Sequence, residues 1–158
     1  GTDKVEFLLT SNSKEPLKPL AKVASGGEMS RIMLALKTII AGSDNIPTLI
    51  FDEIDVGISG RISGMVGEKL VHTAAVHQVL CVTHSPQIAA YADAHIVVEK
   101  RDGEDGARTS VRSLTMDERK HEIARILGIS SESESALRHA EEMLYMCGEK
   151  KRCIRSGG

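Results

Sequence analysis

The stretch Thr48-Leu49-Ile50-Phe51-Asp52-Glu53 largely decides the fold that we expect for this chain. Its apolar run is followed directly by two acids, which is typical of a short buried strand that ends at the edge of a sheet. A strand that is apolar on both faces favours a mainly parallel sheet, because helices cover both sides of such a sheet. A second run of this kind, residues 79–83, ends at His84.

Helical patterns alternate with these strands. Apolar residues recur at helical spacing from Ser25 to a stop at Gly42, and again over residues 62–74. A short helix should follow Pro86. The alternation predicts an α/β fold, with a mainly parallel sheet flanked by helices.

The outer parts of the chain predict smaller elements. Residues 5–10 indicate a short strand, and residues 96–98 with 108–112 indicate a late antiparallel hairpin. Two C-terminal helices should follow, each opened by a capping box and ended by a glycine. The boxes are Thr115 with Glu118 and Ser131 with Glu134, and the glycines are Gly128 and Gly148. The basic segment 150–158 is expected to be a disordered tail.

Composition excludes several classes of protein. With 158 residues, 41% of them hydrophobic and 27% charged, the chain is expected to be one soluble domain or part of a larger one. No apolar run approaches the ~20 residues that a membrane helix needs. The net charge of −2 gives no general sign of nucleic-acid binding, and 3% aromatic residues argue against a base-stacking surface. The three cysteines lack metal-ligand spacing and are expected to be reduced thiols of a cytosolic protein.

The segment Ser25-Gly26-Gly27-Glu28 opens the first long helix. Ser25 suits the N-cap position, and Glu28 suits its capping-box partner. The two glycines remove side chains from the first turn, so that a phosphate could approach the backbone N–H groups at the positive end of the helix dipole. An ordinary capped helix with incidental glycines explains the same pattern equally well.

Two acids and a histidine stand at the carboxyl ends of the two predicted strands, where ligands bind in α/β sheets. Asp52 suits a Mg²⁺ ion, directly or through water, and Glu53 suits a base that orients and deprotonates a water. Asp55 lies in the glycine-containing loop that follows, and His84 could contact a terminal phosphate. Taken singly, each residue also fits a solvated acid or a hydrogen-bonded loop histidine.

Taken in order, these features resemble the signature motif, Walker B motif, D-loop and switch histidine of ABC ATPases. The sequence around them resembles the RecN family of bacterial DNA-repair proteins, which is similar to the SMC and Rad50 proteins. The resemblance rests on residues 17–28, 30–37, 51–53, 55, 57, 59–61, 78–84, 86–90 and 139–144. It covers nearly the whole chain and weakens over the last residues.

The resemblance implies that residues 1–149 are the C-terminal lobe of an ABC-type P-loop ATPase head. Such a head binds and hydrolyses ATP with Mg²⁺ in DNA double-strand-break repair and recombination. ATP lies between this head and a second head of the same protein. By motif match, Asp52 would hold Mg²⁺ through water, Glu53 would be the catalytic base, and His84 would sense the γ-phosphate.

The same resemblance assigns the remaining site residues. Ser25, Gly26, Gly27 and Glu28 would complete the nucleotide site of the partner head in trans, and Asp55 would lie at the dimer interface. The implied location is the cytoplasm, in association with the nucleoid. DNA is expected to bind through the complete protein, and no membrane partner is expected.

One departure from the family pattern limits what the chain can do. No Gly-x-x-x-x-Gly-Lys-Ser/Thr sequence occurs, so the Walker A loop that cradles phosphates is absent. We therefore expect the segment alone to bind ATP weakly and not to hydrolyse it. Its expected partners include an N-terminal lobe with Walker A and a coiled coil.

Two other functions stay open. An ATPase subunit of an ABC transporter shares the same motifs, although the loop 55–61 and the two C-terminal helices are more similar to RecN. A non-catalytic dimerisation lobe is the second alternative, although the intact acids and His84 argue against it. For the arginines at 101, 108 and 112 and the basic tail, a solvated surface is favoured over a DNA contact.

Overall fold

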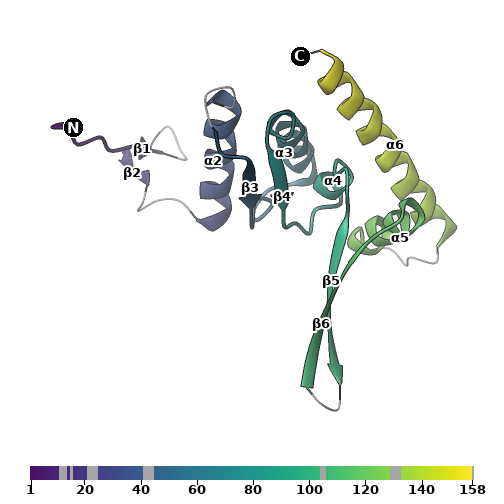
Figure 1. Cartoon of the computed structure of the whole chain (residues 1–158). Helices are drawn as coiled ribbons and strands as arrows, with labels where there is room; N and C mark the ends of the chain where they lie inside the picture. Colours follow the sequence, from purple (N-terminus) through teal and green to yellow (C-terminus); the bar gives the residue numbers. More distant parts are fainter. Residues whose placement is uncertain are drawn as a thin grey trace.

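The computed structural model describes residues 1–10, 14, 16–20, 25–40, 45–103, 106–128 and 133–157, of which 101–103 are described by their backbone. Its strands are β1 (Leu8–Leu9), β2 (Lys18–Pro19), β3 (Thr48–Phe51), β4 (Gln78–Cys81), β5 (Ile96–Gly103) and β6 (Gly106–Ser113). Its helices are α2 (Gly26–Ile40), α3 (Gly60–Thr73), α4 (Pro86–Ala89), α5 (Met116–Ile126) and α6 (Glu134–Ser156). The α/β class, the late hairpin and the two C-terminal helices are confirmed (Figure 1).

The parallel part of the fold consists of β3 and β4. These strands pair in parallel from Thr48 opposite Gln78 to Phe51 opposite Cys81, and α3 connects them. Within the described ranges, every sheet has two strands, and β3–β4 is the one parallel pair. The parallel sheet that the sequence predicts is therefore present here as its two neighbouring strands, those that end at the acids and at His84.

One face of the β3–β4 pair is buried. Leu49 and Phe51 pack with Leu34 of α2 and with Val66 and Leu70 of α3 in one hydrophobic core. This packing is what places the N-terminus of α2 beside the C-terminal end of β3.

The opposite face of the same pair is exposed. Ile50 is 69% exposed, Leu80, directly opposite it, is 44% exposed, and Val82 is 57% exposed. The expectation that the strand 48–51 is buried on both faces is wrong for this chain, because the described helices cover only one side.

A second core joins the end of the chain to α4. Ile123 and Ala124 of α5 and Ala136 and Ala140 of α6 are completely buried, and they pack with Tyr91. The Thr115–Glu118 capping box of α5 is confirmed in both of its hydrogen bonds. Gly128, with a φ of 73°, follows the end of this helix as the sequence predicts.

Helix α6 differs from its prediction at both ends. It begins after Ser133, which makes no side-chain cap, while Ser131 lies outside the described residues. It passes through Gly148 and continues to Ser156, so a stop at Gly148 and a disordered tail from residue 150 are both wrong.

Ion pairs explain why the basic end of α6 is ordered. Lys150 pairs with Glu68 at 2.8 Å, while Lys151 and Arg155 pair with Asp93 at 2.9 and 2.7 Å. The sequence shows the basic residues, whereas only the tertiary structure shows the acids that face them.

The remaining elements lie at the periphery. The hairpin β5–β6 pairs antiparallel from Ile96 opposite Ser113 to Gly103 opposite Gly106, and it projects away from the body of the fold (Figure 1). The strand expected at 5–10 is reduced to β1, which pairs with β2 over two residues. Within the described ranges, no helix combines the length and the apolar character that a bilayer crossing requires.

Candidate functional site

The mouth of helix α2 is capped as the sequence predicts. The Ser25 N–H donates to Glu28 Oε2 at 3.0 Å, and the Glu28 N–H donates to Ser25 Oγ at 3.4 Å. The bond from the Ser25 backbone is the largest cause of the lowered pKa of Glu28. Ser25 and Gly26 are exposed, whereas Gly27 is buried. The turn therefore reaches the surface through its first two residues.

Gly26 and Gly27 allow the acidic loop of the same chain, residues 52–56, to approach the helix closely. A Cβ on Gly26 would collide with Glu53 Oε2, and a Cβ on Gly27 would lie 2.7 Å from Glu53 O and 3.1 Å from Val56 O. The absence of side chains here thus has a packing reason within the chain itself. The turn and the acidic loop lie side by side within one chain.

The two adjacent acids lie at the C-terminal end of β3, as expected. Asp52 and Glu53 are both exposed, and Asp52 Oδ1 accepts the Glu53 N–H at 2.9 Å. Glu53 has a φ of 56°, and it is the one non-glycine residue with positive φ in the described part of the chain. A left-handed backbone is costly for a glutamate, and strained residues of this kind cluster at active sites and ligand-binding sites.

Asp55 joins this loop to the end of β4. Asp55 Oδ2 accepts the Thr83 hydroxyl at 2.7 Å and the His84 backbone N–H at 2.8 Å. Burial acts to raise the pKa of Asp55, but these hydrogen bonds outweigh it and the pKa is lowered. The carboxylate is therefore held in its charged form and fixes the segment that carries His84. The sequence reasoning missed Thr83, whose position directly before His84 was the available signal.

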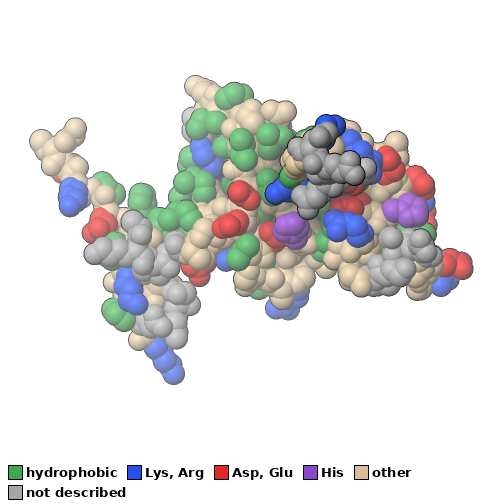
Figure 2. All heavy atoms as spheres, turned by 90° about the horizontal axis from the view of Figure 1, so that it is seen from below, with side chains coloured by type: hydrophobic (Ala, Val, Ile, Leu, Met, Phe, Trp, Pro, Cys, Tyr) green, Lys and Arg blue, Asp and Glu red, His purple; other side chains and the backbone are tan. Residues whose placement is uncertain are grey.

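The acids and the histidine open onto the same end of the sheet. Figure 2 views the molecule from below, the end at which the β3 arrow terminates, and shows acidic side chains and a histidine together on that surface. A hollow of about 290 Å³ lies beside them, and its lining includes Asp55, His84 and Gln87. The structure thus brings together Gly26, Glu53, Asp55 and His84 from α2 and from the ends of two strands.

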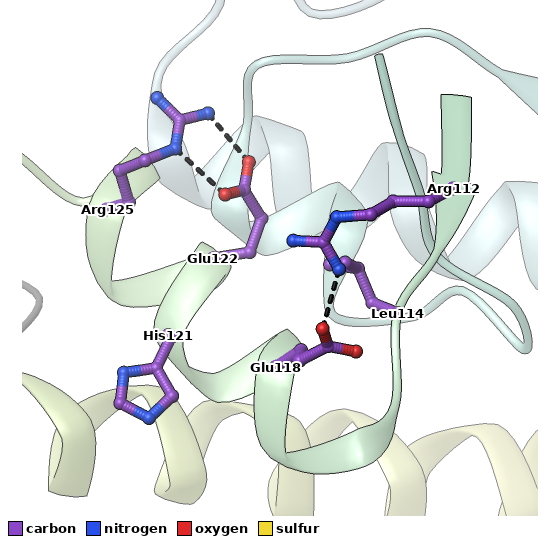
Figure 3. A pocket seen from close by; sticks show the side chains of 6 residues that line it. All are labelled: Arg112, Leu114, Glu118, His121, Glu122 and Arg125. Atoms are coloured by element: carbon purple, nitrogen blue, oxygen red, sulfur yellow. Dashed lines mark hydrogen bonds and ion pairs between the residues drawn. The ribbon is translucent and has the colours of Figure 1, made fainter. Parts of the chain in front are cut away.

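A second hollow, of about 220 Å³, lies away from this site at the base of the hairpin. Figure 3 shows that its charged side chains satisfy one another: Arg125 pairs with Glu122 and Arg112 pairs with Glu118, each at 2.6 Å. Arg112 is thus engaged with an acid of α5.

Metal binding would depend on Asp52. Among the residues that the structure describes, no three His, Cys, Asp or Glu side chains converge to form a protein-only metal site. Asp52, as a single exposed carboxylate, fits Mg²⁺, which usually keeps several waters and takes its other ligands from phosphates. The Cys81 thiol is an unsuitable ligand, because burial above all, with the charges of Asp55 and Asp52, raises its pKa to about 12.

Comparison with known proteins identifies similar chains. The chain is 48% identical over 144 residues to the DNA repair protein RecN of Halalkalibacterium halodurans, covering 91% of this chain and 26% of that protein. It is 46% identical to RecN of Treponema pallidum and 42% identical to RecN of Bacillus subtilis, in each case covering 96% of this chain and 26% of that protein. The chain thus spans about a quarter of the length of these relatives, and no protein-family model matches it.

A solved structure supports the same relationship. An SMC ATPase, studied for its ATP-driven dimerisation and DNA-stimulated activation, matches with a TM-score of 0.50 and 25% identity, covering 73% of this chain and 66% of that one. The resemblance to RecN and to SMC-type ATPases that the sequence motifs indicate is therefore confirmed.

Proposed function

Because this chain is homologous to RecN along nine tenths of its length, we propose that it is part of the ATPase head of a DNA-repair protein. The head would bind and hydrolyse ATP in the repair of double-strand breaks, in the cytoplasm and in association with the nucleoid. The observation that carries the proposal is the strained Glu53, which lies at the end of β3 between the glycine turn of α2 and the Asp55–His84 contact.

Each residue of the site has a chemical role in this proposal. The exposed Glu53 carboxylate is the base that orients a water and takes its proton. Asp52 would hold Mg²⁺ through water, and a bound ion would supply positive charge opposite the phosphates. His84 contacts the terminal phosphate, and Asp55 fixes the backbone from which His84 projects.

The helix mouth would serve a second head. Ser25 and Gly26 are exposed residues at the positive end of the α2 dipole, and Glu28, which accepts the Ser25 N–H, fixes the turn. We propose that Ser25 and Gly26 receive the phosphates of ATP bound to the partner, so that ATP closes a homodimer with Asp55 near the interface. Within one chain the same turn contacts Glu53, so an assay must distinguish a site shared between heads from a site within one head.

Other parts of the complete protein would supply what this chain lacks. An N-terminal lobe with Walker A would cover the exposed face formed by Ile50, Leu80 and Val82, and DNA would bind through the assembled protein. The segment alone should therefore bind ATP weakly and not turn it over. Coexpression with the N-terminal part of a RecN protein should yield a complex that Ile50→Arg prevents from forming.

The role of Glu53 is tested in the complete RecN-length protein. Glu53→Gln should slow ATP hydrolysis by roughly 10²- to 10⁴-fold while ATP binding and head dimerisation persist, since the amide cannot accept the proton. Glu141→Gln, an exposed acid on α6, is the matched control and should leave turnover unchanged. Unchanged hydrolysis in Glu53→Gln would remove this residue from the role of base.

A mixing experiment tests whether the site is shared between heads. Ser25→Arg and Glu53→Gln are each expected to be inactive alone. If each site combines Ser25 of one head with Glu53 of the other, a mixture of the two variants recovers about a quarter of the sites, because half of the dimers are mixed and each has one intact site. If both residues serve one head, mixing recovers no activity.

Fractionation separates the proposed function from the transporter alternative. The complete protein should sediment with DNA in a salt-sensitive manner. Recovery with membranes in place of DNA would favour a transporter subunit.

A further inference from the structure

Two side chains of α2 attach the acidic loop to the helix. Arg31 Nη1 donates to Ile54 O at 3.1 Å and to Val56 O at 2.8 Å. One residue earlier, Ser30 Oγ donates to Asp52 O at 2.7 Å. The carbonyls of residues 52, 54 and 56 are thus held by consecutive residues of the helix that begins at the glycine turn.

The other attachments of the loop give it little freedom. The Val56 N–H donates to Glu53 O at 3.0 Å, and Ile54 has no exposed surface. On the far side, Asp55 Oδ2 accepts from Thr83 and His84. The loop therefore lies between α2 and the end of β4. Two of the hydrogen bonds that join the loop to α2 come from Arg31.

We propose that Arg31, together with Ser30, is a positioning residue that makes the glycine turn of α2 and the acidic loop 52–56 move as one unit. This inference rests on the proposed function, because it links the binding of an anion at the N-terminus of α2 to the position of Glu53. Neither side chain need touch nucleotide for this role. Since both Arg31 bonds come from one terminal nitrogen, a lysine ammonium can replace them, whereas methionine cannot.

Hydrogen exchange on the 158-residue chain tests the attachment without any ATPase assay. Arg31→Met should increase exchange at the Val56 N–H about tenfold, because the loop opens locally when its bonds to α2 are lost. Arg31→Lys should stay near wild type, and Arg138→Met, which removes an exposed arginine from α6, should change nothing in the loop. Unaltered loop exchange in Arg31→Met would overturn the proposal. Should Arg31→Met not fold, Ser30→Ala must loosen the same loop for the proposal to stand.

Kinetics of the complete RecN-length protein test the consequence for turnover. Arg31→Met should lower kcat by about 10- to 100-fold with KM for ATP within about twofold of wild type, because a misplaced base affects chemistry more than binding. Arg31→Lys should recover most of kcat. A looser loop with unchanged kcat overturns the positioning role, and so does a change in KM alone. Failure of the proposed function is recognised separately, because it would appear as unchanged turnover in Glu53→Gln.

Discussion

Replacing Gly27 by alanine tests the close approach between α2 and the acidic loop. Glycine in a helix normally costs about 1 kcal/mol relative to alanine, so Gly→Ala in a helix is expected to stabilise. At Gly27, the new methyl carbon would lie 2.7 Å from Glu53 O, a backbone atom that cannot rotate away. The helix and the loop would have to separate, and Arg31 would lose its bonds to the loop.

The magnitude follows from two opposing effects. Overpacking against backbone costs about 1–3 kcal/mol, and the gain in helix propensity at this first-turn position is less than about 1 kcal/mol. Gly27→Ala should therefore lower the free energy of unfolding by about 1–2 kcal/mol. Gly64 in α3 is the matched control, because its Cβ would meet no described atom within 4 Å. Gly64→Ala should raise the free energy of unfolding by about 0.5–1 kcal/mol.

Urea denaturation of the 158-residue chain and of both variants, followed by circular dichroism, measures these differences. The m-values should be unchanged, so that shifts in midpoint report stability. If Gly27→Ala were stabilised as much as Gly64→Ala, the close packing of the turn against the Glu53 peptide would be refuted.

Other regions of the fold give three further predictions. Thr115→Ala should destabilise the chain by about 1 kcal/mol in the same urea assay, because α5 loses its N-cap bond, and an equal midpoint would contradict the capping role. Cys153 is exposed and should react with a thiol reagent at pH 8, whereas Cys81, which is partly buried and has a raised pKa, should react much more slowly in the folded chain; equal rates would contradict this difference. The hydrogen bond from Arg155 is the largest cause of the lowered pKa of Asp93, so this contact stabilises the fold above the ordinary carboxyl pKa and is lost as pH falls through the folded value. Asp93→Asn should therefore increase hydrogen exchange in the last turns of α6 at neutral pH, and the difference from wild type should vanish at low pH.

The sequence alone predicted those parts of the structure that depend on residues close together in the chain. The capping box at Thr115, the helix start at Ser25 and the β3 run 48–51 all appear where local pattern places them. The motif order likewise indicated the RecN-type relationship, because spacing between motifs is a property of the chain itself. Local reasoning was wrong at Gly148, because acids distant in sequence keep α6 helical beyond it.

What the sequence determined by itself is the set of groups available for chemistry: side-chain-free amides at 26–27, two acids after a strand, and a histidine after the next. Only the tertiary structure decided how they are held. Asp55 is bonded to Thr83 and His84 from 28 and 29 residues away, and Arg31 reaches carbonyls 23 and 25 residues away. No local pattern encodes these bonds, because they form only when the packing of α2 and α3 on one face of β3–β4 brings the segments together.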